Sequence, residues 1–182
     1  MTFRAIGLGL LLGLGMAVAQ ADEAAPAAPA EIREQLDGYL FAAARAGDIE
    51  VLETFVEAGY DLDRADAKGY TALILAAYHG HRDAVRLLLD AGADPCHADQ
   101  RGNTALLGAI FKGEVRIARA LMAADCAPDH RNKAGQTPAM YAALFQRTEI
   151  LHDLRARGAD LDAVDDAGNS VESIARWAAG EP

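Results

Sequence analysis

Two histidines and two cysteines are the side chains in this sequence best suited to holding a metal ion or a haem. His97 and His130 are 33 residues apart, Cys96 directly precedes His97, and Cys126 lies shortly before His130. Imidazole and thiolate groups are common ligands of zinc, copper and iron. These four residues define one hypothesis, a metal- or haem-binding carrier protein. We favour the alternative, ordinary loop residues with no metal and no cofactor, because their spacing matches no familiar ligand pattern.

The two cysteines also raise the question of a disulfide. In an oxidising compartment thiols tend to be paired or buried. Cys96 and Cys126 fall in successive connecting segments, three places out of register with a 33-residue spacing. The sequence leaves open both a bridge and two separately buried thiols.

Catalytic groups do not converge in this sequence. The only serines, Ser170 and Ser173, have no histidine nearby in the register. Asp66, Asp99 and Asp165 recur at one spacing, which indicates a structural role for them. The glycines recur at the same spacing and do not gather into a phosphate-binding loop. We therefore predict that the protein is not an enzyme and has no catalytic residues.

Composition narrows the class of protein further. The chain has 182 residues, of which 52% are hydrophobic, and 17 Lys and Arg face 27 Asp and Glu, a net charge of −10. This is too apolar for an intrinsically disordered chain and too acidic for general nucleic-acid binding.

The N-terminus predicts export. Arg4 precedes an uncharged apolar run over residues 5–18, and Ala19-Gln20-Ala21 is a small-x-small cleavage site. We expect residues 1–21 to be a signal peptide and residues 22–30 an Ala/Pro-rich linker. The mature protein would be periplasmic or secreted, with no membrane span, because the apolar run is short for a bilayer. The alternative is an uncleaved N-terminal anchor.

A repeated pattern at a spacing of 33 residues organises the rest of the chain. Four segments begin with Asp or Asn, continue with Gly three residues later and with Thr or Ser two residues after that; they start at Asp66, Asp99, Asn132 and Asp165. Glycine permits a tight turn, and the hydroxyl can cap the first turn of a helix. A second helix with one apolar face follows and ends at a Gly-Ala-Asp in residues 92–94 and 158–160. Each unit is thus predicted to be a turn and two helices.

These residues resemble the ankyrin repeat, most closely in "GYTALILAAYHGHRDAVRLLLDAGADP" at residues 69–95. The resemblance implies an all-α solenoid over residues 31–180. It would comprise an N-terminal capping repeat at 31–65, full repeats at 66–98, 99–131 and 132–164, and a partial C-terminal cap at 165–180. The histidine of the family's T-P-L-H motif is replaced by Ile74, Leu107, Met140 and Ser173, so any hydrogen-bond network built on it is absent.

The resemblance also implies a function and a site. Ankyrin stacks bind other proteins in a concave groove lined by the turn tips and the outer ends of the first helices. Similar small exported bacterial proteins are thought to support periplasmic enzymes such as catalase or to neutralise a toxin. The groove residues that we expect to bind a partner are Arg45, Lys68, Tyr70, Tyr78, His79, Arg101, Phe111, Lys112, Arg131, Lys133, Leu144 and Phe145.

This set is basic and aromatic within an acidic protein. It contains all three lysines of the chain, and among the groove positions we expect Asp166 to be the only acid. Tyr78, Phe111 and Leu144 occupy one register position and are expected to form an exposed apolar row, which with the cations suits a partner protein bearing an acidic patch. The alternative is that the rings lie flat on neighbouring repeats. We expect the protein itself to be a monomer.

Overall fold

The computed structural model describes residues 29–124 and 126–180. The predicted signal peptide, residues 1–21, and most of the predicted linker, residues 22–30, lie outside the described residues. The helices of the described part are α1 (Ala30–Ala46), α2 (Ile49–Glu57), α3 (Ala72–His79), α4 (Arg82–Asp90), α5 (Ala105–Lys112), α6 (Val115–Ala123), α7 (Pro138–Leu144), α8 (Thr148–Ala156) and α9 (Val171–Ala178). Between them the described residues form isolated β-bridges and no named strand, which confirms the predicted all-α class.

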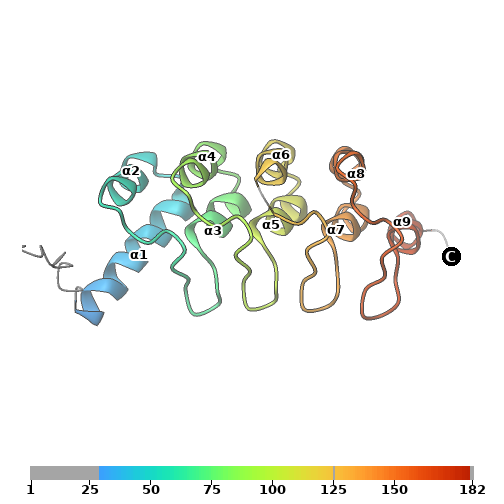
Figure 1. Cartoon of the computed structure of the whole chain (residues 1–182), viewed down its shortest axis with the longest axis horizontal. Coiled ribbons are helices and arrows are strands. Elements are labelled where there is room, and N and C mark those ends of the chain that lie inside the picture. Colours follow the sequence, from blue (N-terminus) through green and yellow to red (C-terminus); the bar gives the residue numbers. More distant parts are fainter. Residues whose placement is uncertain (1–28, 125, 181–182) are drawn as a thin grey trace, which may run out of the picture.

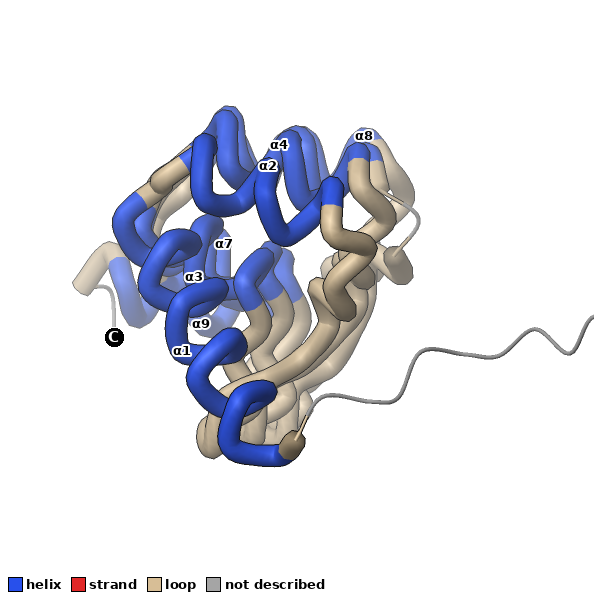
Figure 2. The backbone as a smooth tube through the Cα atoms, turned by 90° about the vertical axis from the view of Figure 1, so that its left-hand side faces the viewer, coloured by secondary structure: helices blue, strands red, loops and turns tan. Residues whose placement is uncertain are grey.

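The helices form two parallel rows. Figure 1 shows α1, α3, α5, α7 and α9 side by side in one row, with α2, α4, α6 and α8 in a second row above them. The connecting loops project together on the other side of the first row, as the end view in Figure 2 also shows. This is the solenoid that the 33-residue spacing predicted. None of the described helices is both long and apolar enough to cross a lipid bilayer.

The repeated turn residues start the first helix of each repeat. The side-chain oxygens of Thr71, Thr137 and Ser170 accept hydrogen bonds from the amides of the third helical residue, and Pro138 occupies the first helical position of α7. These contacts satisfy amides that an uncapped helix leaves without partners.

The first-row helices are packed on both sides and are rich in alanine. In α3 every residue from Ala72 to Ala77 is buried, because α1, α4 and α5 surround the helix. The second-row helices are amphipathic instead. In α4 only Ala84, Val85 and Leu88 are buried, and they face the first row. The core therefore runs continuously between the rows.

The turn tips are joined along the stack by backbone hydrogen bonds. The amide of Gln100 donates to the carbonyl of Lys68 over 2.9 Å, and the amide of Lys133 donates to that of Arg101 over 2.9 Å. Gly69 makes this approach feasible, since its φ is 81° and a Cβ there would lie 2.8 Å from the Gln100 nitrogen. The spacing of the tips is thus set by covalent geometry and direct bonds.

Residues at the start of the second-row helices brace the preceding repeat. His81 donates from Nε2 to the carbonyl of Arg45 over 2.8 Å. At the corresponding position two repeats later, Arg147 donates to the carbonyls of Ile110 and Phe111 over 3.3 and 3.2 Å. These side chains occupy otherwise unpaired carbonyls at the ends of first-row helices.

Candidate functional site

A hollow of about 600 Å³ lies on the first-row helices beside the turn tips. Its walls come from α3, α5 and α7 and from the tips that precede α3 and α5. Eight of the twelve predicted groove residues line it: Arg45, Lys68, Tyr70, Tyr78, His79, Arg101, Phe111 and Phe145. A volume of this size is typical of sites that hold a ligand or an anchoring side chain.

Three aromatic rings form a continuous row along the hollow. Tyr78 and Phe111 are stacked with centroids 6.0 Å apart and planes at 8°, and Phe111 meets Phe145 edge-to-face at 4.9 Å. Tyr78 and Phe111 remain 40% and 41% exposed. The rings contact one another without being covered by the rest of the stack, so much of their apolar surface faces solvent.

Leu144 does not take the place in this row that we predicted. It is half-buried and packs against the core, and Phe145 supplies the third ring instead. The reason lies in the end of α7. This helix stops at Leu144, and Gln146 adopts a left-handed φ of 55° where the two preceding repeats have glycine. The chain turns away earlier and Phe145 meets Phe111.

Two aromatic residues near this surface were not among the predicted residues. Trp177, in α9, is 71% exposed and lies 33 residues after Leu144, so the repeat spacing alone could have found it. Tyr141 lines the hollow from α7, and its hydroxyl donates to the side-chain oxygen of Asn103 over 3.3 Å. Burial raises the pKa of Tyr141, which keeps this hydroxyl protonated.

Positive side chains surround the row. The Lys112 ammonium lies 5.2 Å from the centroid of the Tyr78 ring, a cation–π contact. Lys68 and Arg101 are exposed and form no ion pair within the described part of the chain. His79 packs edge-on against Tyr78 with centroids 5.5 Å apart. Burial and nearby positive charge lower the pKa of His79, so its imidazole is neutral near pH 7.

The prediction that Asp166 is the only acid of the groove is wrong. Asp66 and Asp99 also line the hollow. Asp99 is only 8% exposed, and one of its oxygens accepts from the amides of Arg101 and Asn103, each over 2.8 Å. Asp66 holds its own turn in the same way and pairs with Arg45 at 3.4 Å. Both carboxylates are needed by their turns, so sequence repetition explained their structural role and missed their position.

Arg131 and Lys133 lie beyond the lining of the hollow. The Arg131 guanidinium donates to the carbonyls of Gly135 and Val164 over 2.9 and 2.7 Å, which ties one turn to the next repeat. Lys133 is exposed at the adjacent tip. Arg131 therefore has a clear structural role, while Lys133 contributes charge at the edge of the groove.

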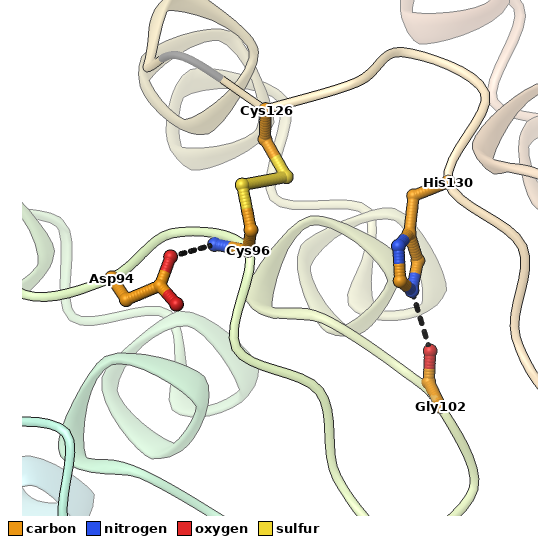
Figure 3. Close-up of a disulfide and its surroundings, with 5 residues drawn as sticks. All are labelled: Asp94, Cys96, Gly102, Cys126 and His130. Atoms are coloured by element: carbon orange, nitrogen blue, oxygen red, sulfur yellow. Dashed lines mark hydrogen bonds between the residues drawn. A yellow bond between two sulfur atoms is a disulfide. The ribbon is translucent and has the colours of Figure 1, made fainter.

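The histidine and cysteine cluster is not arranged as a metal site. Cys96 and Cys126 form a disulfide with Cα atoms 5.5 Å apart, which answers the question that the sequence left open (Figure 3). His130 donates from Nε2 to the carbonyl of Gly102 over 2.9 Å. Within the described residues no three His, Cys, Asp or Glu side chains lie together as metal ligands would. The geometry therefore favours the groove over the carrier hypothesis.

A family model described as ankyrin repeats in three copies matches residues 27–99 and 92–165. A search of curated proteins found no match. Ankyrin repeats are generally protein–protein interaction modules, and their fold is typically non-enzymatic. The family match, the two rows of helices and the projecting turns lead to one conclusion: this chain belongs to the ankyrin repeat family.

Proposed function

We propose that the protein binds a partner protein in the groove formed by its first-row helices and turn tips, and that the partner presents an acidic patch there. The exposed aromatic row of Tyr78, Phe111 and Phe145 carries this proposal. Aromatic side chains supply most of the binding energy at many interfaces, because they bury a large area with little loss of conformational freedom. Lys68, Arg101 and Lys112 around the row would steer an acidic partner and favour its orientation.

The rigidity of the scaffold supports the same function. The turn tips are linked by backbone hydrogen bonds from Lys68 to Gln100 and from Arg101 to Lys133. A surface held in one geometry before binding loses little entropy when a partner docks. The aromatic row and its cations therefore act as one preformed site.

We further propose that the protein works as a monomer in the periplasm or after secretion. The N-terminal sequence supports export, and the Cys96–Cys126 disulfide supports an oxidising compartment. The partner would be a periplasmic enzyme such as catalase that the protein supports, or a toxin that it neutralises. Both roles use the same groove, and identification of the partner separates them.

The test is paired affinity capture from the periplasm. The protein serves as bait beside a variant with Tyr78, Phe111 and Phe145 changed to Ala, and bound proteins are identified by mass. Tyr39→Ala is the matched control, since Tyr39 is an exposed aromatic residue of α1 that does not line the hollow. Circular dichroism spectra and thermal melts establish that all three baits are folded.

A partner that the protein and the Tyr39→Ala control both retain, and that the triple variant loses, supports the proposal. Truncation of central aromatic residues typically costs about 2 kcal/mol or more each, so the loss should exceed a hundredfold in Kd. If the triple variant captures the same proteins, the groove is not the binding site. The hypothesis of a carrier built on His97 and His130 would then be tested by the metal content and visible absorbance of the purified protein.

A further inference from the structure

Gly108 stands in the middle of α5, where a glycine is unfavourable. The helix runs from Ala105 to Lys112, and its C-terminal glycine, Gly113, has the left-handed backbone that glycine suits, whereas Gly108 does not. Glycine is the poorest helix former after proline, because it loses the most backbone freedom on folding. Neither backbone conformation nor helix stability accounts for this residue.

Close packing does not account for it either. A Cβ atom at Gly108 would lie 3.8 Å from the Cβ and 3.9 Å from Cδ2 of Tyr78, which is ordinary van der Waals contact. Alanine would therefore fit. By contrast, a Cβ at Gly69 or Gly102 would lie 2.8 Å from a backbone nitrogen of the next turn. Gly108 is dispensable for the stack in a way that the turn glycines are not.

The consequence of Gly108 is space in the floor of the groove. The corresponding positions of the neighbouring repeats carry Leu75 and Tyr141, and all three residues line the same hollow. Since Gly108 has no side chain, the surface between Leu75 and Tyr141 is left open beside Tyr78 and Phe111. The walls of this space are apolar, and its volume falls within the range of ligand pockets.

The rim of the same hollow is positively charged. Lys68 and Arg101 line it, are exposed, and make no ion pair within the described part of the chain. The two carboxylates nearby are already engaged, Asp66 by Arg45 and Asp99 by the amides of its own turn. An occupant with an apolar group and an adjacent carboxylate would complement both parts.

We propose that the hollow over Gly108 is an anchor pocket for one large apolar side chain of the partner, aromatic or leucine, next to an aspartate or glutamate that pairs with Lys68 or Arg101. This inference rests on the proposed function and specifies what the groove recognises. The occupant is a segment of a partner protein. The glycine is kept in the helix because any larger residue would fill the place of that anchor.

A peptide selection tests the pocket before the partner itself has been identified. The protein, expressed as the full chain, is used to select from a random peptide library displayed on phage. The expected result is enrichment of peptides with Phe, Tyr, Trp or Leu beside Asp or Glu. The Kd of one enriched peptide is then measured by calorimetry for the protein and its variants.

Gly108→Leu is expected to weaken this peptide about tenfold to a hundredfold, the effect of excluding one large buried apolar side chain. Gly108→Ala is expected to weaken it about fourfold, as one methylene would, while it raises Tm by about 2–4 °C. The matched control is Gly38→Leu in α1, a helical glycine with no atom near its Cβ position. It should leave the Kd unchanged.

The outcomes separate the pocket from the groove. If both Gly108 variants bind as the wild type does and the triple aromatic variant does not, the anchor pocket is wrong and the proposed groove stands. If every variant binds equally, both proposals fall. Enrichment of peptides without an apolar anchor, or of none, also overturns the pocket. Should Gly108→Leu not fold, Gly108→Ala decides, since a stabilised variant with weaker binding has no structural explanation other than a blocked site.

Discussion

The Cys96–Cys126 disulfide is the only covalent link between repeats in the described part of the chain, and its removal should destabilise the fold by a predictable amount. The bridge joins the segment after α4 to the segment after α6, and the two cysteines are 30 residues apart in sequence. Changing both to alanine removes the bridge without leaving a free thiol. The amide of Cys96 also donates to Asp94 over 2.8 Å, and alanine preserves that contact.

The magnitude follows from loop closure. Crosslinking a loop of this length lowers the entropy of the unfolded chain by about 12 cal/mol/K, which corresponds to about 3.6 kcal/mol at about 25 °C. Domains are typically stable by about 5–15 kcal/mol, so the bridge represents a large part of the total. For a domain of this size the loss corresponds to a fall in Tm of roughly 7–14 °C.

The assay is urea denaturation followed by circular dichroism. Three samples are compared: the oxidised protein, the protein reduced with dithiothreitol, and the Cys96→Ala/Cys126→Ala variant. The reduced protein and the variant should unfold at the same urea concentration, well below the oxidised protein. Neither cysteine lines the hollow, so partner binding at low temperature should be unchanged in the variant.

A double variant within about 1 kcal/mol of the oxidised protein would refute the entropic argument, because no loop of this length can be closed at so small a cost. A reduced protein much less stable than the alanine variant would place the effect in the buried thiols. Equal effects in both samples would place it in the crosslink.

Three other predictions concern charge, pH and the turn tips. Changing Lys112 and Lys133 to Glu should slow association with the captured partner and weaken its salt dependence while thermal melts stay the same, since both side chains are peripheral to the stack; unaltered stopped-flow kinetics would contradict this. The pKa of His79 lies below 6.5, so between these two values the unfolded chain binds more protons than the folded protein, and stability should fall as pH drops below about 6.5. The His79→Gln variant should have a flatter profile of unfolding free energy against pH, and identical profiles would exclude this residue as the source. Gly69→Ala should destabilise the protein by more than about 1–2 kcal/mol, because the left-handed backbone and the close approach to Gln100 both oppose a side chain there; a neutral effect in urea denaturation would show that the tips yield easily.

Local sequence patterns were sufficient to predict most of the fold. Thr71, Thr137 and Ser170 cap their helices as their spacing from the turn glycines indicated. Capping, turn formation and apolar periodicity are properties of a few neighbouring residues, so each can be recognised without the whole structure. A repeat adds a further constraint, because the same pattern must pack against itself in every copy.

The candidate site was less accessible, because it depends on where side chains end up after packing. Sequence register placed Leu144 in the aromatic row, yet the early end of α7 turns it toward the core and brings Phe145 to Phe111. Register also favoured a basic groove, whereas Asp66 and Asp99 line the hollow beside the cations. Trp177 was within reach of the repeat spacing and shows that the rule extends into the last repeat.

The class of this protein follows from local sequence: a 33-residue unit of turn and two helices, its caps, and the family that this unit resembles. Only the packed stack establishes that Cys96 and Cys126 meet, that three rings from successive repeats touch, and that Gly108 opens a hollow between its neighbours. The difference is one of range. Helices and turns are stabilised by contacts within a few residues, while bridges, ring contacts and cavities join residues about one repeat apart, and their existence depends on distances that packing alone defines.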